Sequence, residues 1–183
     1  DDGFGQSVAI ANNVVIVGAP GDDDFGAASG AAYVFRYAAG NWTQETKLVA
    51  FDSEGSNSLG TDVAISGDVV LAGAPQSSVP LHWSGAVYVF RYAAGAWSAE
   101  AKLQAWDAGA GDFFGRSVSL ADGVLVAGAH YNDEAGERAG AAYVFRDDGG
   151  TWTQEQKLLA ANSAAGRWFG YGVSASGNRI VVG

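Results

Sequence analysis

Short apolar runs separated by polar or glycine-containing turns fill the chain, and this pattern predicts β-strands along its whole length. In the first unit we expect four strands, at residues 7–10, 14–17, 31–36 and 42–49. The second run is apolar without alternation, which indicates a strand buried on both faces. The connections are short enough to make neighbouring strands antiparallel.

The fourth run alternates between apolar and polar residues, as expected of an outer strand with one solvated face. Charge on such a strand discourages pairing with another sheet. The two expected faces are Trp42, Gln44, Thr46 and Leu48 on one side, and Thr43, Glu45 and Lys47 on the other.

The same set of strands recurs every 55 residues without an insertion. Four sets of residues keep this spacing. The first set consists of Phe4, Leu59, Phe114 and Phe169, each of which precedes a glycine. The other three sets are Gly18, Gly73, Gly128 and Gly183; Tyr33, Tyr88 and Tyr143; and Trp42, Trp97 and Trp152. The first two strands of the units are joined by polar pairs that tolerate positive φ, namely Asn12-Asn13, Gly67-Asp68, Asp122-Gly123 and Gly177-Asn178. We therefore divide the single region 1–183 into units at about 1–56, 57–111 and 112–166, with a partial unit at 167–183.

A repeat of four antiparallel strands whose inner strands are buried on both faces predicts an all-β fold, a β-propeller. Each unit would be one four-stranded blade, and the chain would form a partial arc of a ring expected to have seven blades. A β-solenoid is the alternative, although its repeats are usually shorter.

These residues resemble the FG-GAP repeat, the blade unit of the integrin α-subunit propeller and of many bacterial surface proteins. The resemblance rests on FGQSVA at residues 4–9, VGAP at 17–20 and GAAYVF at 30–35, and it extends over the whole chain. It implies a module of a secreted or surface protein of bacterial type. Many relatives carry a calcium loop between the FG and GAP strands, but here that interval holds only two-residue turns, too short for six to eight oxygen ligands.

Candidate ligand-binding residues fall on the long loops, which should share one face of the propeller. Acidic and amide side chains are concentrated there, and His82-Trp83 could form part of a stacking surface. The partner face is assigned to Asp22, Asp23, Asp24, His82, Trp83, Asn132, Asp133 and Glu134. Asp22 and Asp24 are the calcium candidates, but adjacent aspartates cannot all face one ion, so we expect no metal and no cofactor. A solvated acidic rim is the plainer interpretation of the charge run.

Charge excludes some partners. The net charge is −10, which disfavours nucleic acid and anionic lipid, and no apolar run is long enough to span a bilayer. The periodic tryptophans and tyrosines are interpreted as packing residues. Arg36, Arg91 and Arg146 also repeat, and each is expected to pair with a nearby acid.

The leading functional hypothesis is a non-catalytic module for protein interaction, adhesion or assembly, at the cell surface or outside the cell. Ser7 and Ser117 resemble nucleophiles, but they repeat with the strand and lack a base. The alternatives are a carbohydrate-binding, lectin-like propeller and an enzyme whose active residues lie outside this segment. The remaining blades are expected to belong to the same, longer polypeptide.

Overall fold

The computed structural model describes residues 2–52 and 55–183, which form antiparallel sheets joined by turns and loops. The first sheet contains β1 (Ser7–Ala11), β2 (Val14–Ala19), β3 (Ala31–Ala38) and β4 (Asn41–Leu48). The second contains β5 (Val63–Ser66), β6 (Val69–Ala74), β7 (Ala86–Ala93) and β8 (Ala96–Leu103). The third contains β9 (Ser117–Ala121), β10 (Val124–Ala129), β11 (Ala141–Asp148) and β12 (Thr151–Leu158). A two-stranded sheet follows, made of β13 (Val173–Ser176) and β14 (Arg179–Val182).

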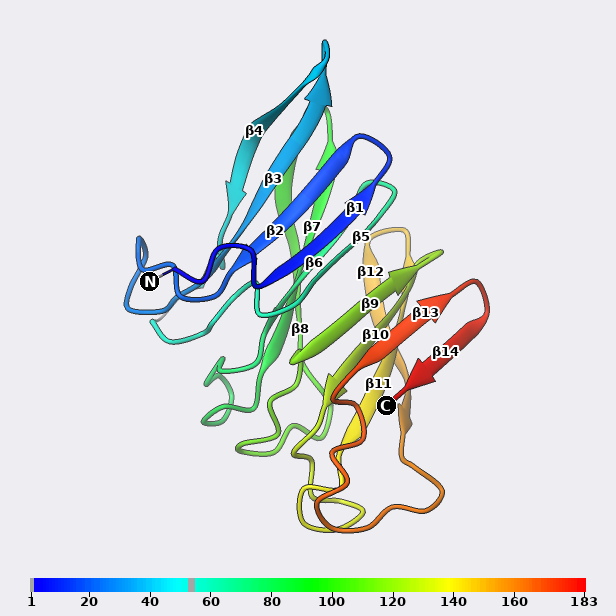
Figure 1. Cartoon of the computed structure of the whole chain (residues 1–183). Coiled ribbons are helices and arrows are strands. Elements are labelled where there is room, and N and C mark those ends of the chain that lie inside the picture. The colour runs from blue at the N-terminus through cyan, green and yellow to red at the C-terminus, as the bar shows by residue number, and fades with distance from the viewer. Residues whose placement is uncertain (1, 53–54) are drawn as a thin grey trace.

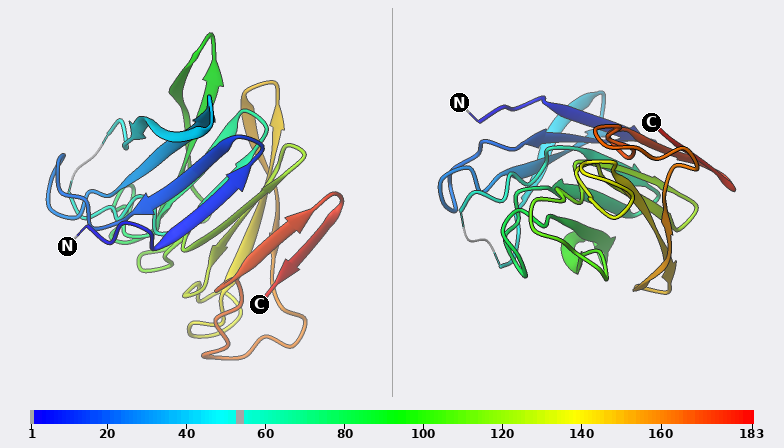
Figure 2. Two further views of the ribbon diagram at one scale, coloured as in Figure 1. Left: turned by 45° about the horizontal axis from the view of Figure 1, so that its top comes forward. Right: turned by 90° about the horizontal axis from the view of Figure 1, so that it is seen from below.

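In each sheet the strands lie in chain order, so every sheet is an up-and-down meander. The first strands of the four sheets, β1, β5, β9 and β13, lie side by side (Figure 1). Successive sheets fan out from that side instead of forming a parallel pile (Figure 2). This arrangement is a partial β-propeller with three full blades and half of a fourth, as the repeat predicted.

The hydrophobic cores lie between consecutive blades. One contains Ile16 and Val34 of the first blade together with Val70 and Tyr88 of the second. The second core repeats this arrangement between the second and third blades. In the second blade both faces of the inner strand β6 are therefore buried, because a neighbouring blade packs on either side.

The glycine of the GAP element allows successive blades to approach closely. A Cβ built on Gly18 would lie 2.0 Å from the carbonyl oxygen of Gly60 in the next unit, and one on Gly73 would lie 2.0 Å from that of Gly115. Only a residue without a side chain fits there. The Ser7 hydroxyl donates to the same Gly60 carbonyl at 2.9 Å, so this repeated serine has a structural bond.

The expected alternation along the fourth strand is wrong at its centre. Thr46 pairs with Val34 and Gln44 with Phe35, so Glu45 is an extra residue in a β-bulge. A bulge shifts the alternation by one residue. Lys47 consequently lies opposite Tyr33, on the face away from Glu45, which instead pairs with Arg36.

The outer face of the first blade is open. Val8 is 67% exposed, whereas its counterparts Val63 and Val118, each covered by a preceding blade, are 5% exposed. At the other end of the arc Val181 in β14 is 68% exposed. These two surfaces are the faces that further blades would cover in a closed ring.

Candidate functional site

Aromatic side chains gather where the long loops of the second and third blades meet. Trp83 lies in the β6–β7 loop, Phe113 precedes β9, and Tyr131 follows β10. The ring centroids of Trp83 and Phe113 are 5.6 Å apart, and those of Phe113 and Tyr131 are 5.4 Å apart with the rings nearly perpendicular. Three rings from two blades therefore form one concave corner.

Two of these aromatics, Trp83 and Tyr131, break the repeat. Position 83 corresponds to Ala28 and Arg138 in the neighbouring units, whereas position 113 corresponds to Ser58 in the second unit and to another aromatic residue, Trp168, in the partial unit. All of these positions have positive φ, including 52° at Trp83 and 55° at Phe113. A bulky residue with left-handed backbone is an uncommon and strained choice, and such residues cluster at functional sites.

The corner forms the wall of a pocket of about 380 Å³, within the size range of small-molecule sites. Charged groups complete its lining, namely Asp133, Glu137 and Arg138. The Arg138 guanidinium lies over the ring of Tyr131, 4.9 Å from its centroid. The pocket therefore combines exposed aromatic surface with both hydrogen-bond acceptors and donors.

Hydrogen bonds from backbone N–H groups hold the loops around the pocket, one between two loops and one within a loop. Phe113 N–H donates to the carbonyl of Trp83 at 3.1 Å, and Arg138 N–H donates to Asp133 Oδ1 at 2.7 Å. A parallel bridge also joins Gly85 to Phe114, the residue that follows Phe113. These bonds fix the pocket walls before any ligand binds.

His130 lies under this aromatic surface. It is 7% exposed, and its ring is 4.2 Å from that of Tyr131 and 5.9 Å from that of Phe113. Burial, together with the charge of Arg116, lowers the pKa of His130 to about 4, so the ring is neutral near pH 7. It replaces the proline of the GAP element found at Pro20 and Pro75.

His82 and Trp83, the stacking pair proposed from the sequence, are both exposed, with ring centroids 4.3 Å apart. Phe113, Tyr131 and Arg138 were not predicted from the sequence. For Tyr131 a signal was present away from any local motif, because its counterparts in the first two units are Gly21 and Gln76 and blade packing does not explain an aromatic residue that does not repeat.

The aspartate triplet of the first blade is bound within the fold. Asp22 is 3% exposed and accepts hydrogen bonds from Lys47 Nζ and the Tyr33 hydroxyl, each at 2.7 Å. Burial alone would raise the pKa of Asp22, but these bonds hold it below its ordinary value. Asp24 also accepts a hydrogen bond from Lys47, at 2.6 Å. The third member of the triplet, Asp23, is exposed and forms no ion pair with the residues that the structure describes.

The predicted site residues of the third blade, Asn132, Asp133 and Glu134, have different roles. Two of them make contacts within the fold, and one lines the pocket. Asn132 is 5% exposed and donates to Asp112 Oδ2 at 2.9 Å, so it anchors the loop internally. Glu134 is exposed and pairs with Lys157. Asp133 is exposed and is the one member of this group that lines the pocket.

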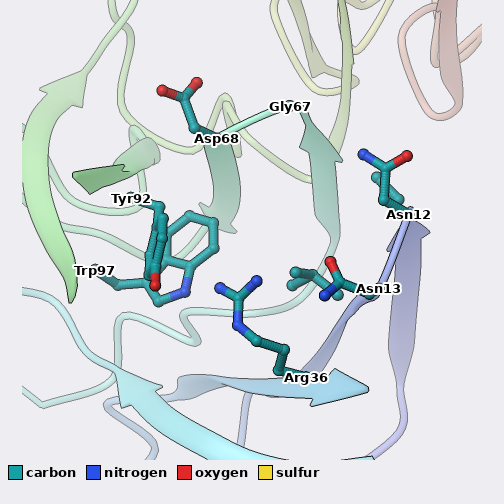
Figure 3. Close-up of a pocket in the computed structure, with 9 residues that line it drawn as sticks. Asn12, Asn13, Arg36, Gly67, Asp68, Tyr92 and Trp97 are labelled. Carbon is teal, nitrogen blue, oxygen red and sulfur yellow. The ribbon is translucent and has the colours of Figure 1, made fainter. Parts of the chain in front are cut away.

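The opposite end of each blade interface carries a smaller cleft. Between the first two blades, Arg36 points toward Tyr92 and Trp97, in a cleft of about 100 Å³ (Figure 3). Its guanidinium lies 4.7 Å from the centre of the Tyr92 ring. Trp97 Nε1 donates to Glu45 at 3.3 Å, so the contact joins the two blades.

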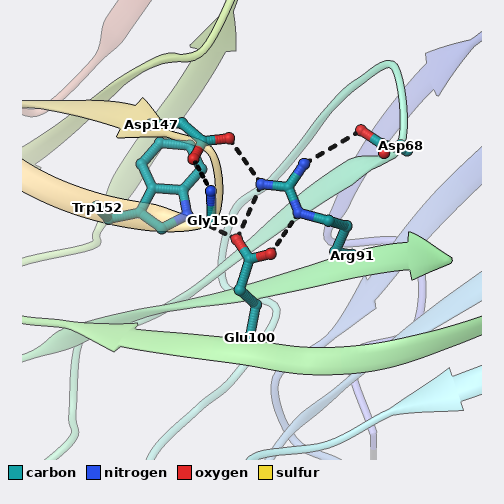
Figure 4. Close-up of polar contacts among 6 residues, drawn as sticks. All are labelled: Asp68, Arg91, Glu100, Asp147, Gly150 and Trp152. Atoms are coloured by element: carbon teal, nitrogen blue, oxygen red, sulfur yellow. Dashed lines mark hydrogen bonds and ion pairs between the residues drawn. The ribbon is translucent and has the colours of Figure 1, made fainter.

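The second interface carries a more extensive version of the same contact (Figure 4). Arg91 pairs with Glu100 of its own blade and reaches Asp147 of the third blade at 2.6 Å. Trp152 Nε1 donates to Glu100 at 2.8 Å. The Arg91 guanidinium holds the pKa of Glu100 below its usual range. The expected pairing of the repeated arginines with an acid is thus confirmed, and its partner is the glutamate of the fourth strand.

Within residues 2–52 and 55–183, no group of three or more His, Cys, Asp or Glu side chains is arranged to hold a metal ion. The described chain also has no helix of the length and apolarity needed to span a membrane. The expectation that calcium does not bind the first blade stays a prediction.

Comparison with known proteins gives the chain its family. The FG-GAP repeat matches residues 1–35, 42–90, 97–145 and 152–183. No curated protein matches the chain. The matched segments cover most of the sequence and keep the 55-residue spacing, and the second and third each run from a fourth strand into the third strand of the following blade. The chain therefore belongs to the FG-GAP repeat family.

Proposed function

We propose that this chain is part of a non-catalytic binding module of a secreted or surface protein, and that it binds its ligand through the long-loop face. The observation that carries the proposal is the pocket between the second and third blades. Two of its aromatic wall residues, Trp83 and Tyr131, depart from the repeat, whereas the aromatic residues that repeat in all three full units are occupied in packing. Fold alone does not define a ligand, so the site must carry the function.

A non-catalytic role is supported by the occupation of the reactive groups. The Ser7 and Ser117 hydroxyls donate to the carbonyls of Gly60 and Gly170, each at 2.9 Å. In each full blade the lysine of the fourth strand pairs with acids of the long-loop face, as Lys102 does with Asp52 at 2.7 Å. Groups held in such pairs stabilise the loops and are not free to act as acid or base.

The exposed apolar surfaces at both ends of the arc support the proposal that further blades of the same polypeptide complete the ring, which we expect to have seven. A protein of this family and charge suits the cell surface or the extracellular space. Protein ligands and glycans are both compatible with a preformed pocket on rigid loops.

The test measures binding of the purified chain to arrays of proteins and of glycans. It compares a variant that alters the pocket with a control variant that alters an exposed aromatic pair of the first blade. We expect the double variant Trp83→Ala/Tyr131→Ala to lose the signals of the unaltered chain. The matched control is Trp42→Ala/Tyr37→Ala, which removes an exposed Trp–Tyr pair far from the pocket. The control should retain the signals. Equal loss in both variants, or signals that survive only in the pocket variant, would contradict the proposal.

A further inference from the structure

We propose that the pocket between the second and third blades binds a neutral saccharide. One sugar ring would lie against Trp83 and Phe113, with its hydroxyl groups directed to Asp133, Glu137 and Arg138. This inference rests on the proposed function, because it names the ligand class of the same site.

The shape of the aromatic wall suits a pyranose ring. Trp83 is 40% exposed, and its ring is tilted by 41° to that of Phe113, while Tyr131 stands at 85° to Phe113. The pocket therefore offers apolar surface on more than one side of a flat ligand. A sugar ring has apolar C–H faces that pack on aromatic rings and a polar edge of hydroxyl groups.

The polar lining distinguishes a neutral sugar from charged ligands. Carboxylates only accept hydrogen bonds and a guanidinium only donates them, whereas a hydroxyl group does both. Asp133 and Glu137 would repel an anion. Arg138 would repel a cation, and it already occupies one face of Tyr131, the position where a ligand cation would gain most from the ring. A neutral polyhydroxylated ligand can use all three groups.

The aromatic surface continues beyond the pocket. Trp168, which precedes β13, is 44% exposed, and its ring lies 5.9 Å from that of Tyr131. It has the same left-handed backbone as Phe113, with φ of 55°. A second sugar ring would therefore find a platform next to the first, and we expect oligosaccharides to bind more tightly than monosaccharides.

The experiment is titration of the chain with cello-, malto- and chito-oligosaccharides of one to six units, followed by calorimetry and tryptophan fluorescence. We expect at least one series to bind, with little change in affinity when salt is added. Trp83→Ala should weaken binding at least about tenfold, or about 1.4 kcal/mol. Trp168→Ala should weaken binding of the longer oligomers only, and Trp42→Ala should leave it unchanged.

A parallel titration with hexaarginine separates the two proposals. If hexaarginine binds through Trp83 and no saccharide series does, the saccharide inference is overturned while the binding function of the face stands. Saccharide binding that is unaffected by Trp83→Ala would also overturn the inference, since the sugar would then bind elsewhere. The array experiment above tests the binding function independently of ligand class.

Discussion

Trp152 of the third blade donates its indole N–H to Glu100 of the second blade at 2.8 Å. Glu100 is held by Arg91, which also reaches across to Asp147. Trp97 makes the equivalent bond to Glu45 at the first interface. The second and third blades thus each contribute a tryptophan to the Arg–Glu pair of the blade before them, a contact that recurs with the 55-residue spacing.

Trp152→Phe should destabilise the fold, because it keeps a large aromatic ring but removes the donor to Glu100. We expect the free energy of unfolding to fall by about 1–2 kcal/mol. Trp42→Phe is the matched control, since Trp42 is 46% exposed on the open face of the first blade. It should change stability by less than about 0.5 kcal/mol. Urea unfolding of the two variants measures the difference, and equal effects would contradict the inter-blade role of Trp152.

Gly73→Ala tests the close approach of the blades. The added Cβ would meet the carbonyl oxygen of Gly115 at 2.0 Å, so the blades would have to separate. We expect a loss of about 3 kcal/mol or more, seen as a lower thermal midpoint or a loss of soluble protein. Gly172→Ala is the control, because no neighbouring atom lies within 4 Å of its Cβ position. A Gly73→Ala variant as stable as this control would show that the interface yields easily.

His130 should make stability depend on pH. Its pKa is about 4 in the folded chain and about 6.5 when unfolded. Between these values only the unfolded state binds the proton, so stability is complete above the unfolded pKa and is lost as the pH falls toward 4. The loss from this group is up to about 3 kcal/mol. His130→Pro, which restores the residue found at Pro75, should flatten the dependence between pH 6.5 and 5, whereas His82→Gln should not.

Trp83→Gly should leave the stability of the fold nearly unchanged. The left-handed backbone at Trp83, with φ of 52°, favours glycine, and relief of this strain offsets the lost ring contacts with His82 and Phe113. We expect a change of less than about 1 kcal/mol by urea unfolding. A loss comparable to that of Trp152→Phe would show that Trp83 holds the loops together.

The sequence was sufficient to predict the propeller because the same faces must be buried in every unit. The continuous apolar run at 14–17 and its counterparts indicated inner strands covered on both sides. The bulge at Glu45 could not be predicted, since alternation alone does not reveal an inserted residue. The register of the β3–β4 pair decides it, with Thr46 opposite Val34.

The candidate site was only partly predictable. The acidic run at Asp22 suggested an exposed surface, but Lys47, 25 positions away, draws this carboxylate into a buried ion pair. Trp83 was identified because it stands beside a histidine. Phe113 and Tyr131 were missed because blade contacts bring together residues far apart in the chain, and no local motif marks that meeting point.

The most direct test of the long-loop face as the binding surface is array binding by Trp83→Gly, a variant expected to retain the stability of the unaltered chain. Loss of the bound signals from a folded Trp83→Gly protein is the predicted result. Full retention of those signals would contradict the assignment, because ligand would then bind without the tryptophan that lines the pocket.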